Sequence, residues 1–73
     1  MDTPLKAGMI LVYNMRFTWF ITSVRGTGYF TATCPFGRTA TPLQRDYNPA
    51  TDMLFPDLLA ARTYARLVGE ELK

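Results

Sequence analysis

The side chains best suited to chemistry in this sequence are three aspartates, a lone cysteine and several arginines near aromatic residues. Histidine is absent, which removes the commonest general base and metal ligand and leaves no imidazole to activate the Cys34 thiol. We interpret Cys34 as a small buried hydrophobic residue. Asp46, Asp52 and Asp57 could form a carboxylate pair, but their predicted places in a loop or at a helix start favour capping. We therefore predict no enzyme activity, no metal and no other cofactor.

Arginine and aromatic residues form the pattern that most favours binding. These two residue types dominate protein-binding hot spots, and they also bind nucleic acids through phosphate contacts and base stacking. Most of the arginines concerned fall at predicted turns. The candidate partner-binding residues in this pattern are Lys6, Arg16, Arg25, Tyr29, Phe36, Arg38 and Arg45. An alternative stays open, in which the aromatic residues fill the core and the scattered cations only keep the protein in solution.

Length and composition predict one small domain, residues 1–73, with a real core. Of the 73 residues, 48% are hydrophobic and 14% aromatic, which is typical of a folded chain. A single cysteine allows no internal disulfide and indicates a reducing, cytoplasmic setting, and no apolar run is long enough to cross a membrane. Residues 1–45 carry five cations against one acid, a net charge of +4; residues 46–73 carry three against five, a net charge of −2. This asymmetry can steer an acidic partner toward the N-terminal part.

The elements expected to position these residues are several strands followed by one helix. Apolar runs and alternation with threonine indicate the strands, glycines at 26 and 28 predict a hairpin turn, and Pro42 confines the last strand to a sheet edge. We predict an N-terminal arm at 1–7, a β-rich part at 8–44 with strands at 9–13, 17–24, 29–34 and 39–44, and a helix within 52–72. The second strand is expected to carry on one face Phe17, Trp19 and Ile21 and on the other Phe20 and Val24.

The predicted helix begins near Asp52 or Pro56, because both residues suit a helix start, and it runs toward Leu72. Its apolar face, expected to pack on the sheet, consists of Leu54, Leu58, Ala61, Ala65, Val68 and Leu72. Another face carries Arg62, Arg66 and Glu70. We therefore predict an α+β fold, with a small antiparallel sheet or SH3-like open barrel of three or four strands and one C-terminal helix.

Three segments of the chain, 6–13, 17–24 and 28–32, are similar to the first three strands of SH3-like and KOW-type modules. Such modules bind proteins or nucleic acids through loops and strand edges. The resemblance therefore implies a binding domain, although a shared fold transfers no function by itself.

A second resemblance concerns size and character. In its length, its histidine-free composition and a basic N-terminal part that holds Leu5, Lys6 and Arg16, the chain resembles small transcription regulators of lytic phages, including those that infect Xanthomonas. This resemblance implies a non-enzymatic protein of the host bacterial cytoplasm that binds host RNA polymerase, interferes with the sigma factor to inhibit initiation, and acts as an antiterminator. It adds Leu5 to the candidate contacts. Two alternatives stay open: a nucleic-acid-binding SH3-like module, and an inhibitor of another host defence enzyme. We expect a monomer without membrane association.

Overall fold

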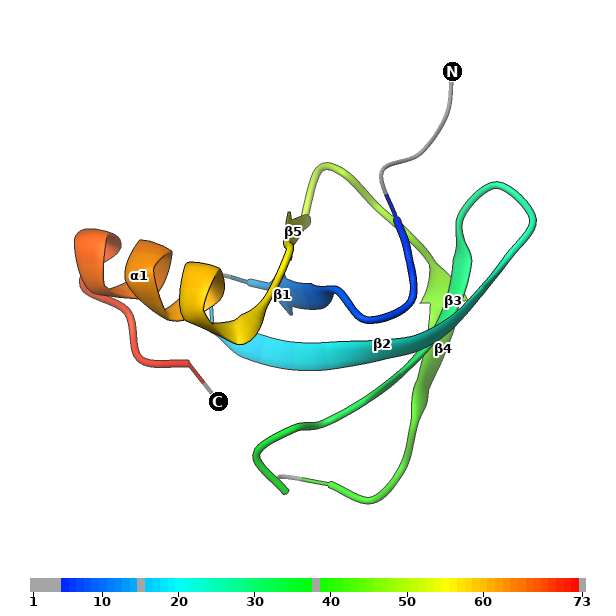
Figure 1. Ribbon diagram of the computed structural model, residues 1–73, viewed down its shortest axis with the longest axis horizontal. Helices are drawn as coiled ribbons and strands as arrows, with labels where there is room; N and C mark the ends of the chain where they lie inside the picture. The colour runs from blue at the N-terminus through cyan, green and yellow to red at the C-terminus, as the bar shows by residue number, and fades with distance from the viewer. Residues whose placement is uncertain (1–4, 15, 38, 73) are drawn as a thin grey trace.

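Five strands and one helix follow one another in the computed structural model, which describes residues 5–14, 16–37 and 39–72 (Figure 1). The strands form one antiparallel sheet in the order β4-β3-β2-β1-β5, and this sheet is open rather than closed into a barrel. The predicted α+β class is confirmed, with one strand more than expected. The elements are β1 (Ile10–Tyr13), β2 (Phe17–Arg25), β3 (Tyr29–Thr33), β4 (Leu43–Asp46), β5 (Asp52–Phe55) and α1 (Leu58–Val68).

Tight turns join the three central strands. Asn14 has a φ of 52° between β1 and β2, and Gly26 has a φ of 57° between β2 and β3. Asparagine and glycine adopt this left-handed conformation more readily than other residues do. The hairpin predicted from the glycines is confirmed, and Arg25 pairs with Tyr29 where the two strands meet the turn.

Both faces of the sheet bury apolar side chains, because the bent sheet encloses one core and α1 packs on the opposite face over β1 and β5 (Figure 1). The inner core contains Leu5, Leu11, Trp19, Ile21, Phe30 and Ala32. The helix core, between sheet and helix, contains Ile10, Val12 and Ala61, with Phe55, Leu58 and Leu72 packed against it. Successive residues of β1 therefore alternate between the two cores. Burial on both faces explains the unbroken apolar run of this strand.

A bulge in β2 changes which side chains share a face. The pairing of β2 with β3 shifts register between Ile21 and Ser23. An extra residue of this kind interrupts the strict alternation of sides along a strand. Val24 consequently packs against the inner core together with Trp19 and Ile21. The prediction that Val24 lies on the opposite face from these two residues was wrong.

The helix begins later than the sequence predicted. Residues 52–55 form β5, which pairs antiparallel with β1, and α1 starts only at Leu58. The N-cap is Asp57, whose side chain accepts a hydrogen bond of 2.8 Å from the amide of Ala60. Capping was expected for Asp46, Asp52 and Asp57. It is confirmed for Asp57, but it was wrong for Asp46, which ends β4, and for Asp52, which begins β5.

The helix ends at Gly69, whose left-handed conformation (φ 76°) allows its amide to bond back to carbonyls of the last turn. Of the predicted apolar face, Ala61 and Ala65 are buried. Leu54 instead lies in β5 against the inner core, and Val68 is exposed. The fourth strand also differs from the prediction, because it occupies Leu43–Asp46 rather than residues 39–44. In the part of the chain that the structure describes, no helix has the length and hydropathy that a membrane span requires.

Candidate functional site

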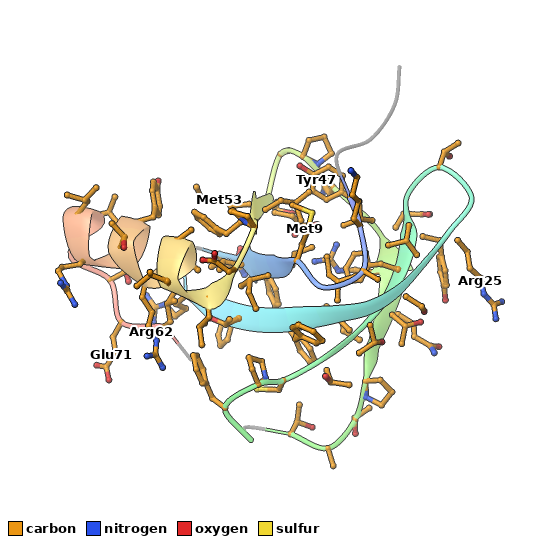
Figure 2. The ribbon with its side chains drawn as sticks, viewed as in Figure 1. Met9, Arg25, Tyr47, Met53, Arg62 and Glu71 are labelled. Atoms are coloured by element: carbon orange, nitrogen blue, oxygen red, sulfur yellow. The ribbon has the colours of Figure 1, made fainter. Side chains whose placement is uncertain are left out.

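The contact residues predicted from the sequence do not gather at one place. Arg16 precedes β2 and Arg25 ends it, so the eight residues 17–24 of the strand lie between them, at about 3.3 Å each. Arg25 does lie beside Tyr29, as an exposed cross-strand pair at the hairpin, and its side chain points outward in Figure 2. Lys6 is exposed, and Arg38 lies outside the described residues.

Leu5 is a residue of the inner core. Its exposed fraction is 4%, and it packs with Leu11, Trp19 and their neighbours. A side chain in this position cannot touch a partner while the protein is folded, so the structure does not support Leu5 as a contact residue. Its place in a short N-terminal arm gave no sign of burial, because the strands that cover it lie far along the chain.

Arg45 joins the two edge strands of the sheet. Its guanidinium donates two hydrogen bonds, of 2.7 and 2.8 Å, to the carboxylate of Asp52, which connects β4 to β5. The guanidinium carbon also lies 5.6 Å from the ring centroid of Tyr13 and 5.3 Å from that of Phe30. Arg45 was predicted to contact a partner, but here it holds the open side of the sheet together.

Asp52 is fully buried at its side chain and is held by several donors. Burial by itself raises the pKa of this carboxyl, but the hydrogen bonds from Arg45, the amide of Asn48 and the hydroxyl of Thr51 outweigh it, and the net pKa is lowered from 3.8. The same ion pair raises the pKa of Arg45. Both groups are therefore charged at neutral pH, and the pair is a structural one.

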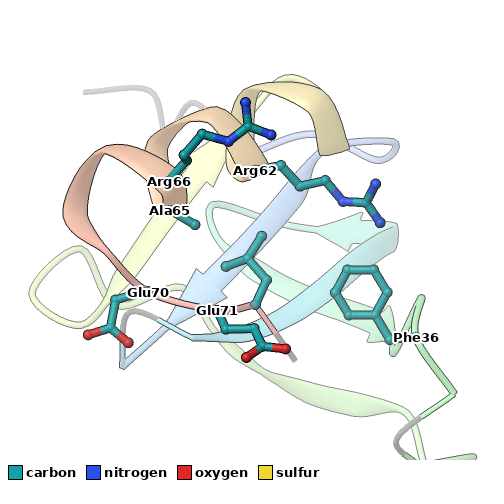
Figure 3. Close-up of a pocket in the computed structure, with 7 residues that line it drawn as sticks. Phe36, Arg62, Ala65, Arg66, Glu70 and Glu71 are labelled. Carbon is teal, nitrogen blue, oxygen red and sulfur yellow. The ribbon is translucent and has the colours of Figure 1, made fainter.

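A groove of about 530 Å³ opens between α1, the segment that follows it, and the loop after β3 (Figure 3). We call it the α1 groove. Its apolar parts come from Phe36, from Leu72 and from Ala65 on the helix. The residues that line it are Phe36, Arg62, Ala65, Arg66, Glu70, Glu71 and Leu72.

The charges of the α1 groove are separated by sign. Figure 3 shows Arg62 and Arg66 on the helix at one side of the groove, and Glu70 and Glu71 on the segment after the helix at the other. The Arg62 guanidinium carbon lies 5.7 Å from the ring centroid of Phe36. Among the described residues, the salt bridge that forms joins Arg45 to Asp52. The four charged side chains of the groove therefore form no salt bridge with any described residue. They are available to a partner.

The outer face of α1, which we define as Leu59, Thr63 and Leu67, exposes large apolar side chains. Leu59 is 75% exposed and Leu67 is 80% exposed. At about 100° per residue, Arg66 lies close to Leu59 around the helix axis. The outer face and the α1 groove therefore form one continuous surface, to which Phe36, 38% exposed, adds an aromatic ring.

Part of this surface was visible in the sequence and part was missed. Phe36 was a candidate contact, and Arg62, Arg66 and Glu70 were placed on a helix face away from the sheet. Leu59 and Leu67 were overlooked, although the signal existed: both are leucines outside the apolar face that packs on the sheet. The uneven charge of the chain favoured the N-terminal cations instead.

A second hollow, of about 630 Å³, lies near Arg45. Its lining includes Tyr13, Tyr47 and Pro49, together with Arg45 itself. Because Arg45 is already bonded to Asp52 and faces two aromatic rings, this hollow offers a partner less unsatisfied charge than the α1 groove does.

Neither metal ligands among the described residues nor similar proteins indicate a function. Within the described residues, no group of three or more His, Cys, Asp and Glu side chains could hold a metal ion. Comparison of the chain with protein families, with curated proteins and with solved structures finds no match.

Proposed function

We propose that this protein is a non-enzymatic phage regulator that binds host bacterial RNA polymerase through the α1 groove and the outer face of α1. The observation that carries the proposal is the exposure of Leu59 and Leu67 beside four charges that form no ion pair within the described chain. Large exposed apolar side chains near arginines are typical of protein-binding surfaces. The choice of polymerase as the partner comes from the resemblance to small phage transcription regulators.

The proposed mechanism is competition. A standard interface needs about 800 Å² from each partner, roughly one sixth of the 4813 Å² that this protein exposes. A monomer of this size can therefore cover a sigma-factor contact on the polymerase and inhibit initiation. Antitermination follows if the protein stays bound to the elongating enzyme. The proposed place of action is the cytoplasm of the host bacterium.

The test is retention of purified RNA polymerase by the tagged protein. After nuclease treatment, we expect core polymerase to be retained at moderate salt, because apolar contacts are less sensitive to salt than phosphate contacts are. Added sigma factor should compete with the protein for the polymerase. Failure to retain polymerase at any salt concentration would refute the proposed partner.

Nucleic-acid binding is a second candidate function, and the exposed pair of Arg25 and Tyr29 favours it. An arginine beside an aromatic ring can contact a phosphate and stack on a base. If this pair binds single-stranded DNA or RNA, Arg25→Gln should weaken binding, and affinity should fall steeply as salt rises. A gel-shift series at low salt measures this, and the absence of any shift would exclude this candidate.

A further inference from the structure

The α1 groove carries two like charges that no described residue neutralises by a salt bridge. Arg62 and Arg66 are four residues apart on α1, a spacing that places their side chains on the same side of a helix, where like charges repel. Neither residue forms a salt bridge among the described residues, although both line the α1 groove. A carboxylate from outside the protein would relieve this repulsion and bind both guanidinium groups.

The position of Arg62 leaves its hydrogen-bond donors accessible. Its guanidinium lies over the ring of Phe36, at 5.7 Å from the centroid. Because Arg62 is also exposed, its N–H donors can be reached by a carboxylate from outside the protein. One ligand can therefore contact the charge of Arg62 and the ring of Phe36 at the same time.

The opposite rim of the groove narrows the choice of ligand. Glu70 and Glu71 line it, and neither forms a salt bridge within the described chain. These acids repel the continuous row of phosphates that a nucleic acid carries. A single carboxylate can reach the two arginines without coming close to the two glutamates. A large apolar side chain next to that carboxylate can pack against Phe36 and Leu72.

We propose that the α1 groove binds a short segment of a protein partner in which an acidic residue stands next to an aromatic or large aliphatic one. The inference rests on the proposed function, because it names the chemistry of the segment that the α1 surface recognises. Arg62 and Arg66 bind the carboxylate, Phe36 and Leu72 contact the apolar side chain, and the two glutamates exclude phosphate chains.

The test uses two blocked synthetic hexapeptides that differ at one position, one with a Phe-Asp pair and the other with a Phe-Asn pair. Each is titrated into the full-length ¹⁵N-labelled protein and followed by NMR. We expect the Asp peptide to cause saturable shifts of the Ala65 and Arg66 amide signals and to bind about fivefold more tightly than the Asn peptide, the ratio for one exposed charge pair. Equal affinities, or no saturable shift at these amides, would overturn the inference. Stronger shifts with a ten-residue oligothymidine would overturn it in favour of a nucleic acid.

Two variants with opposite charge changes check the assignment. In Arg62→Gln/Arg66→Gln the preference for the Asp peptide should disappear, whereas Glu71→Lys should increase affinity for it severalfold. Lys6→Gln, which removes an exposed charge that does not line the groove, is the control and should bind both peptides as the unchanged protein does. An unchanged preference in the double variant would contradict the inference.

Retention of polymerase separates this inference from the proposed function. If Arg62→Gln/Arg66→Gln binds polymerase as well as the unchanged protein does, polymerase remains the partner but the groove is not its binding site. If the unchanged protein prefers the Asp peptide but retains no polymerase, the groove chemistry stands and the proposed partner is wrong.

Discussion

Replacing Asp52 by alanine is expected to lower the free energy of unfolding by about 3 kcal/mol. The change leaves Arg45 without its carboxylate and leaves the amide of Asn48 without its acceptor, at the point where β4 and β5 are held together. Removing one partner of a buried ion pair usually costs about 3–5 kcal/mol, and the lower figure applies because the Arg45 side chain is 32% exposed and can regain water. Urea unfolding followed by circular dichroism measures the change. Asp46→Ala, an exposed carboxylate of the same region, is the control and should change stability by less than about 0.5 kcal/mol.

The same carboxylate should make stability depend on pH. The folded-state pKa of Asp52 lies below its ordinary value of 3.8. A lowered pKa contributes stability that is fully present above the ordinary value and is lost as the pH falls through the folded-state value. The unchanged protein should therefore lose stability as the pH falls below about 4. Asp52→Ala should lack this component. Parallel pH profiles for the two proteins would show that the ion pair contributes nothing measurable.

Replacing Leu5 by alanine should destabilise the protein without weakening its binding in the folded state. Leu5 is buried in the inner core, and a buried leucine-to-alanine change costs about 3 kcal/mol, or about 15 °C in melting temperature for a domain of this size. At a temperature where the variant is folded, its affinity for polymerase should equal that of the unchanged protein. Calorimetry and a binding titration at low temperature measure the two effects.

The adjacent exposed residue provides the control for Leu5. Lys6→Ala should leave the melting temperature nearly unchanged, because Lys6 is exposed. If Leu5→Ala kept its stability but lost affinity, Leu5 would be a contact residue, as the resemblance to phage regulators implied, and its place in the inner core would be wrong.

The local signals in the sequence predicted much of the sheet. Alternating aromatic residues and the glycines of the hairpin gave β2, β3 and the turn between them. They could not give β5, because its residues include no β-branched side chain and lie just before a helix cap. The pairing of Leu54 with Leu11 holds this strand in the sheet, and such a long-range register leaves no local mark in the sequence. The bulge that turns Val24 inward is hidden for the same reason.

The candidate surface was less predictable than the fold. The α1 groove combines Phe36, from the loop after β3, with residues from 62 to 72, and only the folded chain brings these segments together. Cation counts favoured the N-terminal part, where Arg25 remains exposed but Arg45 is bonded to Asp52. Residue type indicated that arginines and aromatic rings suit a binding surface; it could not predict which of them would stay accessible.

The measurement that tests the central claim most directly compares polymerase retention by two double variants. Leu59→Ser/Leu67→Ser alters the outer face of α1, and Arg25→Gln/Tyr29→Ser alters the hairpin at the other end of the long axis (Figure 2). Both pairs are exposed, so neither variant should unfold the protein. We predict that the α1 variant binds polymerase at least about tenfold more weakly and that the hairpin variant binds normally. Normal binding by the α1 variant, with loss in the hairpin variant, would contradict the claim that α1 is the contact surface.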